Sequence, residues 1–275
     1  MPHPGPQPFG RRARRGAALA LVLALGLAGC ATEPTTDRLT ELSGNAEKAR
    51  VSQQLAEAAR KGGDYVGAVD LYRKMLEAGG DPLTAHLGMG DSFLAGGALD
   101  DAEKEYSAVA TIAPNRPEAA LGLGRVYVAK HRPADALAAF DRALAEGGAR
   151  TAALNGKGLA LDLEGDHAAA QQAYQDGLKA APQDRVLRSN YGLSLALSGD
   201  YDAALAQLVP LAQDGQATAR NRQNLALVLG LKGDMAAARL IAQQDMGPDA
   251  VEANLKFYEA ARVASTGTTP GTTPH

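Results

Sequence analysis

The sequence predicts an all-α solenoid of six helical hairpins followed by a capping helix. The first observation is a column that recurs every 34 residues without an insertion: Gly63, Gly97, His131, Gly165, Gly199 and Gly233. The second is a column of alanines five residues later: Ala68, Ala102, Ala136, Ala170, Ala204 and Ala238. A period of this length indicates repeats that stack on one another, because a single unit cannot bury its own apolar face. We expect six repeats over residues 49–248.

Each repeat is predicted to be a helix–turn–helix unit, because two further columns keep the same phase. One holds small residues: Ala56, Gly90, Gly124, Gly158, Gly192 and Ala226. The other holds mostly large residues: Tyr72, Tyr106, Phe140, Tyr174, Leu208 and Ala242. Small side chains allow two helix backbones to approach closely. We therefore expect Gly124 and Ala136 to lie where helices cross, with Phe140 filling the adjoining hollow.

These columns resemble the tetratricopeptide repeat, whose signature contains a small residue, a later alanine and an aromatic residue four positions on. The last repeat departs from the pattern, since Ala242 stands in the aromatic column. Residues 249–265 predict an amphipathic helix with Val251, Leu255 and Tyr258 on one stripe. Such a helix would cover the apolar face that the last repeat leaves open.

The N-terminus has the pattern of an export signal over residues 1–29. Four arginines at positions 11, 12, 14 and 15 precede an apolar and small run over residues 16–29, which is too short to span a membrane permanently. The run ends in Leu27-Ala28-Gly29-Cys30. This tetrapeptide resembles the bacterial lipobox, in which a peptidase cuts before a cysteine that carries diacylglycerol. The alternatives are an ordinary cleavage site, with Cys30 merely a small residue near it, and an uncleaved anchor.

The cysteine count is consistent with lipidation, because Cys30 is the single cysteine of the chain and no intramolecular disulfide can form. Acyl chains contribute ~0.8 kcal/mol per buried methylene and would hold the protein at a membrane. Ala31 follows the cysteine, and by analogy with lipoprotein sorting this favours the periplasmic leaflet of the outer membrane. Residues 30–48 are predicted to be a flexible tether, and residues 266–275 a disordered tail.

Charge and motif content argue against several classes of function. The formal net charge is −3, and it falls to −7 without residues 1–29, so nucleic acid is not an expected partner. The five histidines are scattered, and no nucleophile pattern or metal-ligand spacing is seen in the sequence. The glycine doublets at residues 88–90 and 122–124 fall at one repeat phase, which indicates helix packing rather than a dinucleotide site. We expect no enzyme activity, no cofactor, no metal and no small-molecule substrate.

Protein–protein interaction remains as the expected activity, with the first helices of the repeats as the binding surface. In repeats four to six this surface carries polar amides and leucines at repeating positions. The predicted partner-binding residues are Asn155, Leu159, Asn190, Leu193, Asn224 and Leu227. The amides would hydrogen-bond the backbone of a peptide whose apolar side chains the leucines contact. The alternative is that the leucines pack between helices while the asparagines are only solvated.

The C-terminal segments at residues 221–234 and 251–258 resemble the end of the TadD family of tight-adherence (Flp) pilus assembly lipoproteins. The resemblance implies a scaffold that helps to assemble the pilus secretion apparatus, with the outer-membrane secretin and other assembly components as partners. Two alternatives remain. One is a repeat lipoprotein of another envelope machine, such as outer-membrane barrel assembly or cell-wall synthesis. The other is an enzyme whose active site the sequence does not reveal.

Overall fold

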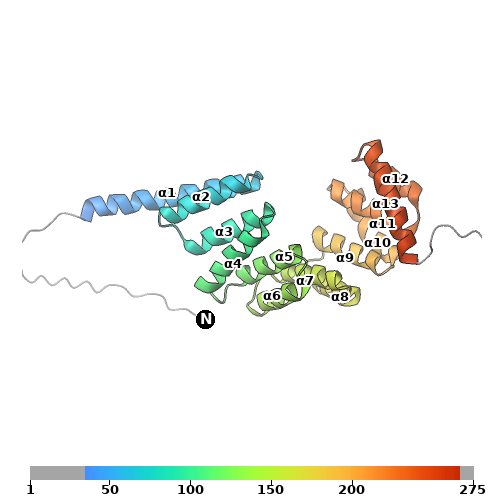
Figure 1. Cartoon of the computed structure of the whole chain (residues 1–275), viewed down its shortest axis with the longest axis horizontal. Helices are drawn as coiled ribbons and strands as arrows, with labels where there is room; N and C mark the ends of the chain where they lie inside the picture. The colour runs from blue at the N-terminus through green and yellow to red at the C-terminus, as the bar shows by residue number, and fades with distance from the viewer. Residues whose placement is uncertain (1–34, 267–275) are drawn as a thin grey trace, which may run out of the picture. The chain divides into compact units, whose positions relative to one another are not determined.

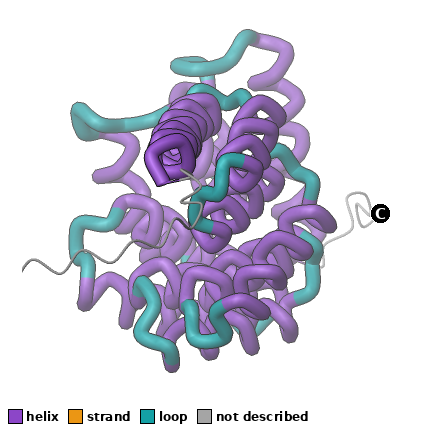
Figure 2. The backbone as a smooth tube through the Cα atoms, turned by 90° about the vertical axis from the view of Figure 1, so that its left-hand side faces the viewer, coloured by secondary structure: helices purple, strands orange, loops and turns teal. Residues whose placement is uncertain are grey.

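The computed structural model describes residues 35–266, which form thirteen helices and contain no strand (Figures 1 and 2). The helices are α1 (Thr35–Lys61), α2 (Tyr65–Glu77), α3 (Pro82–Ala95), α4 (Leu99–Ile112), α5 (Pro117–Ala129), α6 (Pro133–Ala145), α7 (Arg150–Glu164), α8 (His167–Ala180), α9 (Arg185–Leu197), α10 (Tyr201–Gln213), α11 (Ala219–Lys232), α12 (Met235–Ala242) and α13 (Pro248–Thr266). The contacts divide the chain into residues 1–41 and 42–275, and all helices from α2 onward belong to the second unit. The signal segment, Cys30 and residues 267–275 of the predicted tail lie outside the described residues.

Residues 35–48 differ from the predicted flexible tether, because they form the first half of α1. The second half packs on α2, where Ala49 and Ala56 are buried with Tyr72. A helix held in place at one end extends at low cost, since each added residue gains one backbone hydrogen bond without new nucleation. An ion pair between Glu47 and Arg50 at 2.6 Å supports this exposed extension. The polar composition of the segment gave no amphipathic pattern from which a helix could be predicted.

The helices pair as the sequence predicts, and the pairs stack in chain order (Figure 1). Successive helices from α2 to α12 pack against one another, so each hairpin also contacts the next. The first helices of neighbouring repeats make a second set of contacts, namely α3 with α5, α5 with α7, α7 with α9, and α9 with α11. The second helices α4, α6, α8 and α10 make no such contacts with one another. The helices α3, α5, α7, α9 and α11 therefore form one continuous surface, which we call the first-helix row.

The column of glycines closes the first helix of each repeat. All five glycines of this column have positive φ, from +78° at Gly97 to +103° at Gly233, a region that costs other residues energy. His131 occupies the same position with φ +54°, and it is the one described non-glycine residue with positive φ. A left-handed residue here ends one helix and turns the chain toward the next. The 34-residue column is thus explained by backbone geometry.

The aromatic column joins neighbouring repeats. Phe140 of α6 is fully buried and lies over two glycines, Gly124 of its own repeat and Gly156 of the next. A Cβ atom at Gly124 would lie 2.6 Å from Phe140 Cε1, and one at Gly156 would lie 2.2 Å from Cζ. Tyr106 is placed over Gly90 and Gly122 in the same way. Each large side chain therefore fills space that two glycines leave, and this locks one hairpin onto the following hairpin.

Helix α13 covers the end of the array, as predicted. Its residues Val251, Leu255 and Tyr258 are buried against α11 and α12. Tyr258 lies over Gly230 of α11, where a Cβ atom would approach its Cδ2 to 2.5 Å. Ala242 can be small because α13 contacts this position in place of a further repeat. The predicted fold class, an all-α repeat solenoid with a capping helix, is confirmed.

An aspartate that follows the turn glycine caps the second helix in four of the six repeats. Asp200 Oδ1 accepts a hydrogen bond from the backbone N–H of Ala203 at 3.1 Å. We expect Asp200→Ala to lower the free energy of unfolding by ~1 kcal/mol, measured by urea denaturation, because one N–H at the start of α10 loses its acceptor. Asp200→Ser keeps an acceptor oxygen and should lose much less. Equal losses for the two variants would contradict a capping role.

Candidate functional site

Three hollows lie along the first-helix row and together form one groove. The α5–α7 hollow has a volume of about 490 Å³, the α7–α9 hollow about 370 Å³ and the α9–α11 hollow about 470 Å³. The first two hollows share Val128 and Leu159 as lining residues. The last two share Asn190 and Leu193. Because adjacent hollows have common walls, we treat them as a single surface and call it the inner groove.

Five of the six predicted partner-binding residues line this groove. Asn155 and Leu159 line the α5–α7 hollow, Asn190 and Leu193 line the next two, and Asn224 lines the α9–α11 hollow. Leu227 is not among the lining residues. It is half-buried and packs against the core cluster that α11, α12 and α13 share. The packing alternative thus describes Leu227, and it applies in part to Leu193, which lines the groove but also packs against the core cluster of α9, α10 and α11. Partner binding by the five lining residues stays a prediction.

The asparagines are linked across neighbouring helices. Asn190 Nδ2 donates a hydrogen bond to Asn155 Oδ1 at 2.8 Å. Asn224 Nδ2 donates to Ser189 Oγ at 2.9 Å. Each amide donor has a second N–H group, and each carbonyl has a second lone pair, so the pairs fix the side-chain orientation without exhausting their bonding capacity. The groove therefore presents oriented amides to a bound backbone.

The sequence contained a signal for these asparagines beyond their shared phase. Asn190 and Asn224 occupy the column that holds Gly88, Gly122 and Gly156 in the preceding repeats. Those glycines make room for the aromatic residue of the previous repeat. From repeat five onward the column changes from a packing glycine to an amide that lines the groove. The change from glycine to asparagine therefore marks the repeats in which this column carries a polar side chain.

Sequence reasoning missed the exposed apolar wall of the groove. Leu163 is 43% exposed and Leu197 is 59% exposed, and both line the α7–α9 hollow. Val186, which is 62% exposed, lines the α9–α11 hollow. Leu163 and Leu197 are 34 residues apart, so the same column method could have found them. Clustered apolar side chains that remain in water indicate an interaction surface.

A largely enclosed carboxylate, that of Asp162, organises the floor of the α7–α9 hollow. Asp162 accepts hydrogen bonds from Tyr174 OH at 3.0 Å, from Ser194 Oγ at 2.7 Å and from His167 Nδ1 at 2.8 Å. Burial, together with the negative charge of Asp162, raises the pKa of Tyr174 above its ordinary value. The phenol therefore stays protonated and serves as a donor. This network binds α7 to α8 and α9 and gives the hollow a fixed floor.

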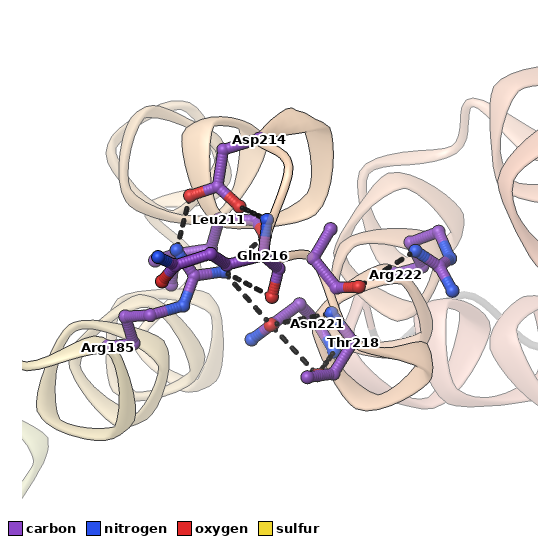
Figure 3. A network of polar contacts seen from close by, with 8 residues as sticks. Arg185, Leu211, Asp214, Gln216, Thr218, Asn221 and Arg222 are labelled. Carbon is purple, nitrogen blue, oxygen red and sulfur yellow. Dashed lines mark hydrogen bonds and ion pairs between the residues drawn. The ribbon is translucent and has the colours of Figure 1, made fainter.

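A second network holds the end of the groove at α9 and α11 (Figure 3). Arg185 pairs with Asp214, and its Nη2 donates to the Leu211 carbonyl at 2.9 Å and to Asn221 Oδ1 at 3.3 Å. Thr218 and Asn221 form a capping box at the start of α11. The Arg185 guanidinium lowers the pKa of the Asp214 carboxyl. These contacts fasten the loop between α10 and α11 to α9 and fix the wall of the α9–α11 hollow.

The described residues offer no metal site and no membrane span. Within residues 35–266, no three His, Cys, Asp or Glu side chains gather closely enough to hold a metal ion. No helix in this part of the chain is both long and apolar enough to cross a membrane.

Comparison with known proteins agrees with this architecture. Residues 54–117 and 121–185 match the family model described as "Tetratricopeptide repeat". The match covers the first four repeats, and the stacked hairpins have the fold of a tetratricopeptide-repeat solenoid. Proteins of this class use the surface of the stacked repeats as a scaffold for protein–protein interaction.

Three solved structures illustrate the similarity of fold. One is a tetratricopeptide repeat protein from Parabacteroides merdae, with a TM-score of 0.64 and 16% identity over 76% of this chain and 84% of that chain. Another is PilF of Pseudomonas aeruginosa, with a TM-score of 0.59 and 19% identity over 73% and 91% of the two chains. A third is PilW, described as a widely conserved type IV pilus biogenesis factor, with a TM-score of 0.59 and 22% identity over 81% and 95%. At these identities the similarity concerns the fold.

A curated relative matches part of the sequence. It is the uncharacterized protein y4yS of Sinorhizobium fredii, which is 40% identical over 77 residues, or 28% of this chain and 42% of that protein. The match therefore spans less than half of the length of this relative.

Proposed function

We propose that the protein is a lipid-anchored scaffold of the outer membrane that binds a protein segment in the inner groove and helps to assemble a tight-adherence pilus secretion apparatus. The observation that carries the proposal is the groove, where exposed leucines lie beside oriented amides. A segment bound there would bury apolar side chains against Leu163 and Leu197. Its backbone would hydrogen-bond the amides of Asn190 and Asn224.

The pilus assignment rests on two resemblances. The C-terminal segments at residues 221–234 and 251–258 resemble the TadD family, and the fold is similar to that of the pilus biogenesis factor PilW. We infer that the partner is the outer-membrane secretin or a component that acts with it. The second candidate is a scaffold of another envelope machine, since a repeat solenoid of this class serves many assemblies.

Co-purification from detergent-solubilised envelopes tests the partner. The tagged full-length protein should enrich a secretin, identified by mass spectrometry, and crosslinks should involve α7, α9 or α11. A preparation that instead enriches barrel-assembly or cell-wall components, with the secretin at background, would replace the pilus assignment by the second candidate. The variants described in the Discussion determine whether the inner groove is the contact surface.

The anchor gives a separate prediction. We expect Cys30→Ser to abolish incorporation of a labelled fatty acid and to leave unprocessed precursor or mislocalised protein, because no other residue of the chain can supply the thiol. Metabolic labelling followed by membrane fractionation measures both effects. The wild-type protein is the positive control. Label retained by the Cys30→Ser variant would contradict the lipid anchor.

A further inference from the structure

The inner groove carries one positive charge that no acid of the described residues balances. Arg220 on the first turn of α11 is exposed and lines the α9–α11 hollow, and no ion pair or hydrogen bond of its side chain is found within residues 35–266. The other two arginines of the groove are compensated, Arg125 by Asp91 at 3.2 Å and Arg185 by Asp214. A binding partner can therefore neutralise Arg220 without breaking an existing ion pair.

Acidic groups are nearly absent from the lining of the three hollows. The single carboxylate there is Asp162, whose side chain is 11% exposed and already accepts three hydrogen bonds. The protein as a whole is acidic, with a formal net charge of −3. The C-terminal half of the groove thus has the opposite sign to the molecule as a whole. Local charge of this kind selects a partner more strongly than it raises affinity.

The arginine lies next to the apolar part of the groove. The α9–α11 hollow, which Arg220 lines, shares Asn190 and Leu193 with the α7–α9 hollow, where Leu163 and Leu197 are exposed. A segment that places an apolar side chain on these leucines therefore passes the amides within a few residues before it reaches Arg220. Leu163 and Leu197 lie at the C-terminal ends of α7 and α9, whereas the amides lie nearer the N-terminal ends of the first helices. The cation follows on the first turn of α11.

We propose that the inner groove recognises a segment of its protein partner in which an acidic side chain follows apolar side chains by a few residues, with the carboxylate on Arg220 and the apolar groups on Leu163 and Leu197. This inference rests on the proposed use of the groove as the partner-binding surface. It names the chemistry of the segment. An acidic segment without leucines, or an apolar segment with lysines, would satisfy only part of the surface.

Defined peptides test the proposal with the full-length protein in detergent. Three fluorescent twelve-residue peptides with acetylated and amidated ends are compared by anisotropy: one with leucines and two glutamates, one with lysines in place of the glutamates, and one with serines in place of the leucines. We expect the first to bind at least tenfold more tightly than either of the others, and its advantage over the lysine peptide should shrink at high salt. Equal or tighter binding of the lysine peptide, or of the serine peptide, would overturn the proposal.

Reversing the charge of Arg220 tests whether this residue binds the carboxylate. Arg220→Glu should remove the preference for the glutamate peptide over the lysine peptide or invert it, while Arg150→Glu should leave it unchanged. Arg150 is a matched control because it is also exposed on the first turn of a first helix and does not line any of the three hollows. Circular dichroism confirms folding of both. An unchanged preference in a folded Arg220→Glu variant would refute the assignment of the carboxylate site.

The outcome is distinguishable from failure of the proposed function. Capture of an envelope partner that depends on the groove, without any preference among the peptides, would refute the acidic segment alone. If capture of the envelope partner did not depend on the groove and the peptides also bound without preference, the partner would bind elsewhere on the protein.

Discussion

Gly124→Leu should lower the free energy of unfolding by ~1–3 kcal/mol or more, since the new side chain has no space to occupy. Even a Cβ atom at this position would lie 2.6 Å from Phe140 Cε1, well inside van der Waals contact. Phe140 cannot move away easily, because Gly156 of the next repeat holds its other side at a similar distance. The leucine must therefore separate two repeats as well as two helices. Thermal and urea denaturation measure the loss.

Gln172→Leu provides the control for this substitution. Gln172 is exposed on α8 and donates one hydrogen bond, to Asp176 at 3.1 Å. Replacement by leucine at such a surface position should change the free energy of unfolding by less than about 0.5 kcal/mol. If Gly124→Leu and Gln172→Leu melt at the same temperature, the small-residue column does not mark helix contacts and the packing described above is incorrect.

The double variant Leu163→Glu/Leu197→Glu should abolish partner capture while the fold survives. Both leucines are substantially exposed, so the glutamates remain solvated in the free protein. In a complex they would place two charges against apolar groups of the partner. Loss of two apolar contacts worth ~1.5 kcal/mol each corresponds to an increase in Kd of about 100-fold, and uncompensated burial of charge adds to it. Capture from solubilised envelopes and a binding titration measure the effect.

The matched control is Leu240→Glu on α12. Leu240 is 66% exposed and does not line the groove, so its substitution places a glutamate at a solvated position elsewhere. Its partner capture should equal that of the wild-type protein. Circular dichroism and melting of each variant confirm folding. Wild-type capture by a folded double variant would place the contact on another surface, for example on the exposed face of α13.

The sequence predicted the fold more completely than it predicted the residues of the groove. The columns of Gly124, Ala136 and Phe140 predicted the hairpins correctly, because close helix packing requires small residues at fixed spacing. The same spacing placed Asn190 and Leu193 on the first helices, and the structure places them in the groove. Leu227 shares the phase of Leu193, but it is half-buried against the core cluster that includes residues of α13 and does not line the groove.

The sequence by itself determined the period, the hairpin and the capping helix, because these depend on local backbone geometry and on contacts between neighbouring repeats. It did not determine how far α1 extends, since a helix anchored at one end can continue through polar residues that show no pattern. Only the tertiary structure decided which side chains stay exposed, as Leu163 and Leu197 show. It also decided which charges are already paired and so left Arg220 as the uncompensated cation in the groove, because an ion pair between helices depends on how the repeats stack.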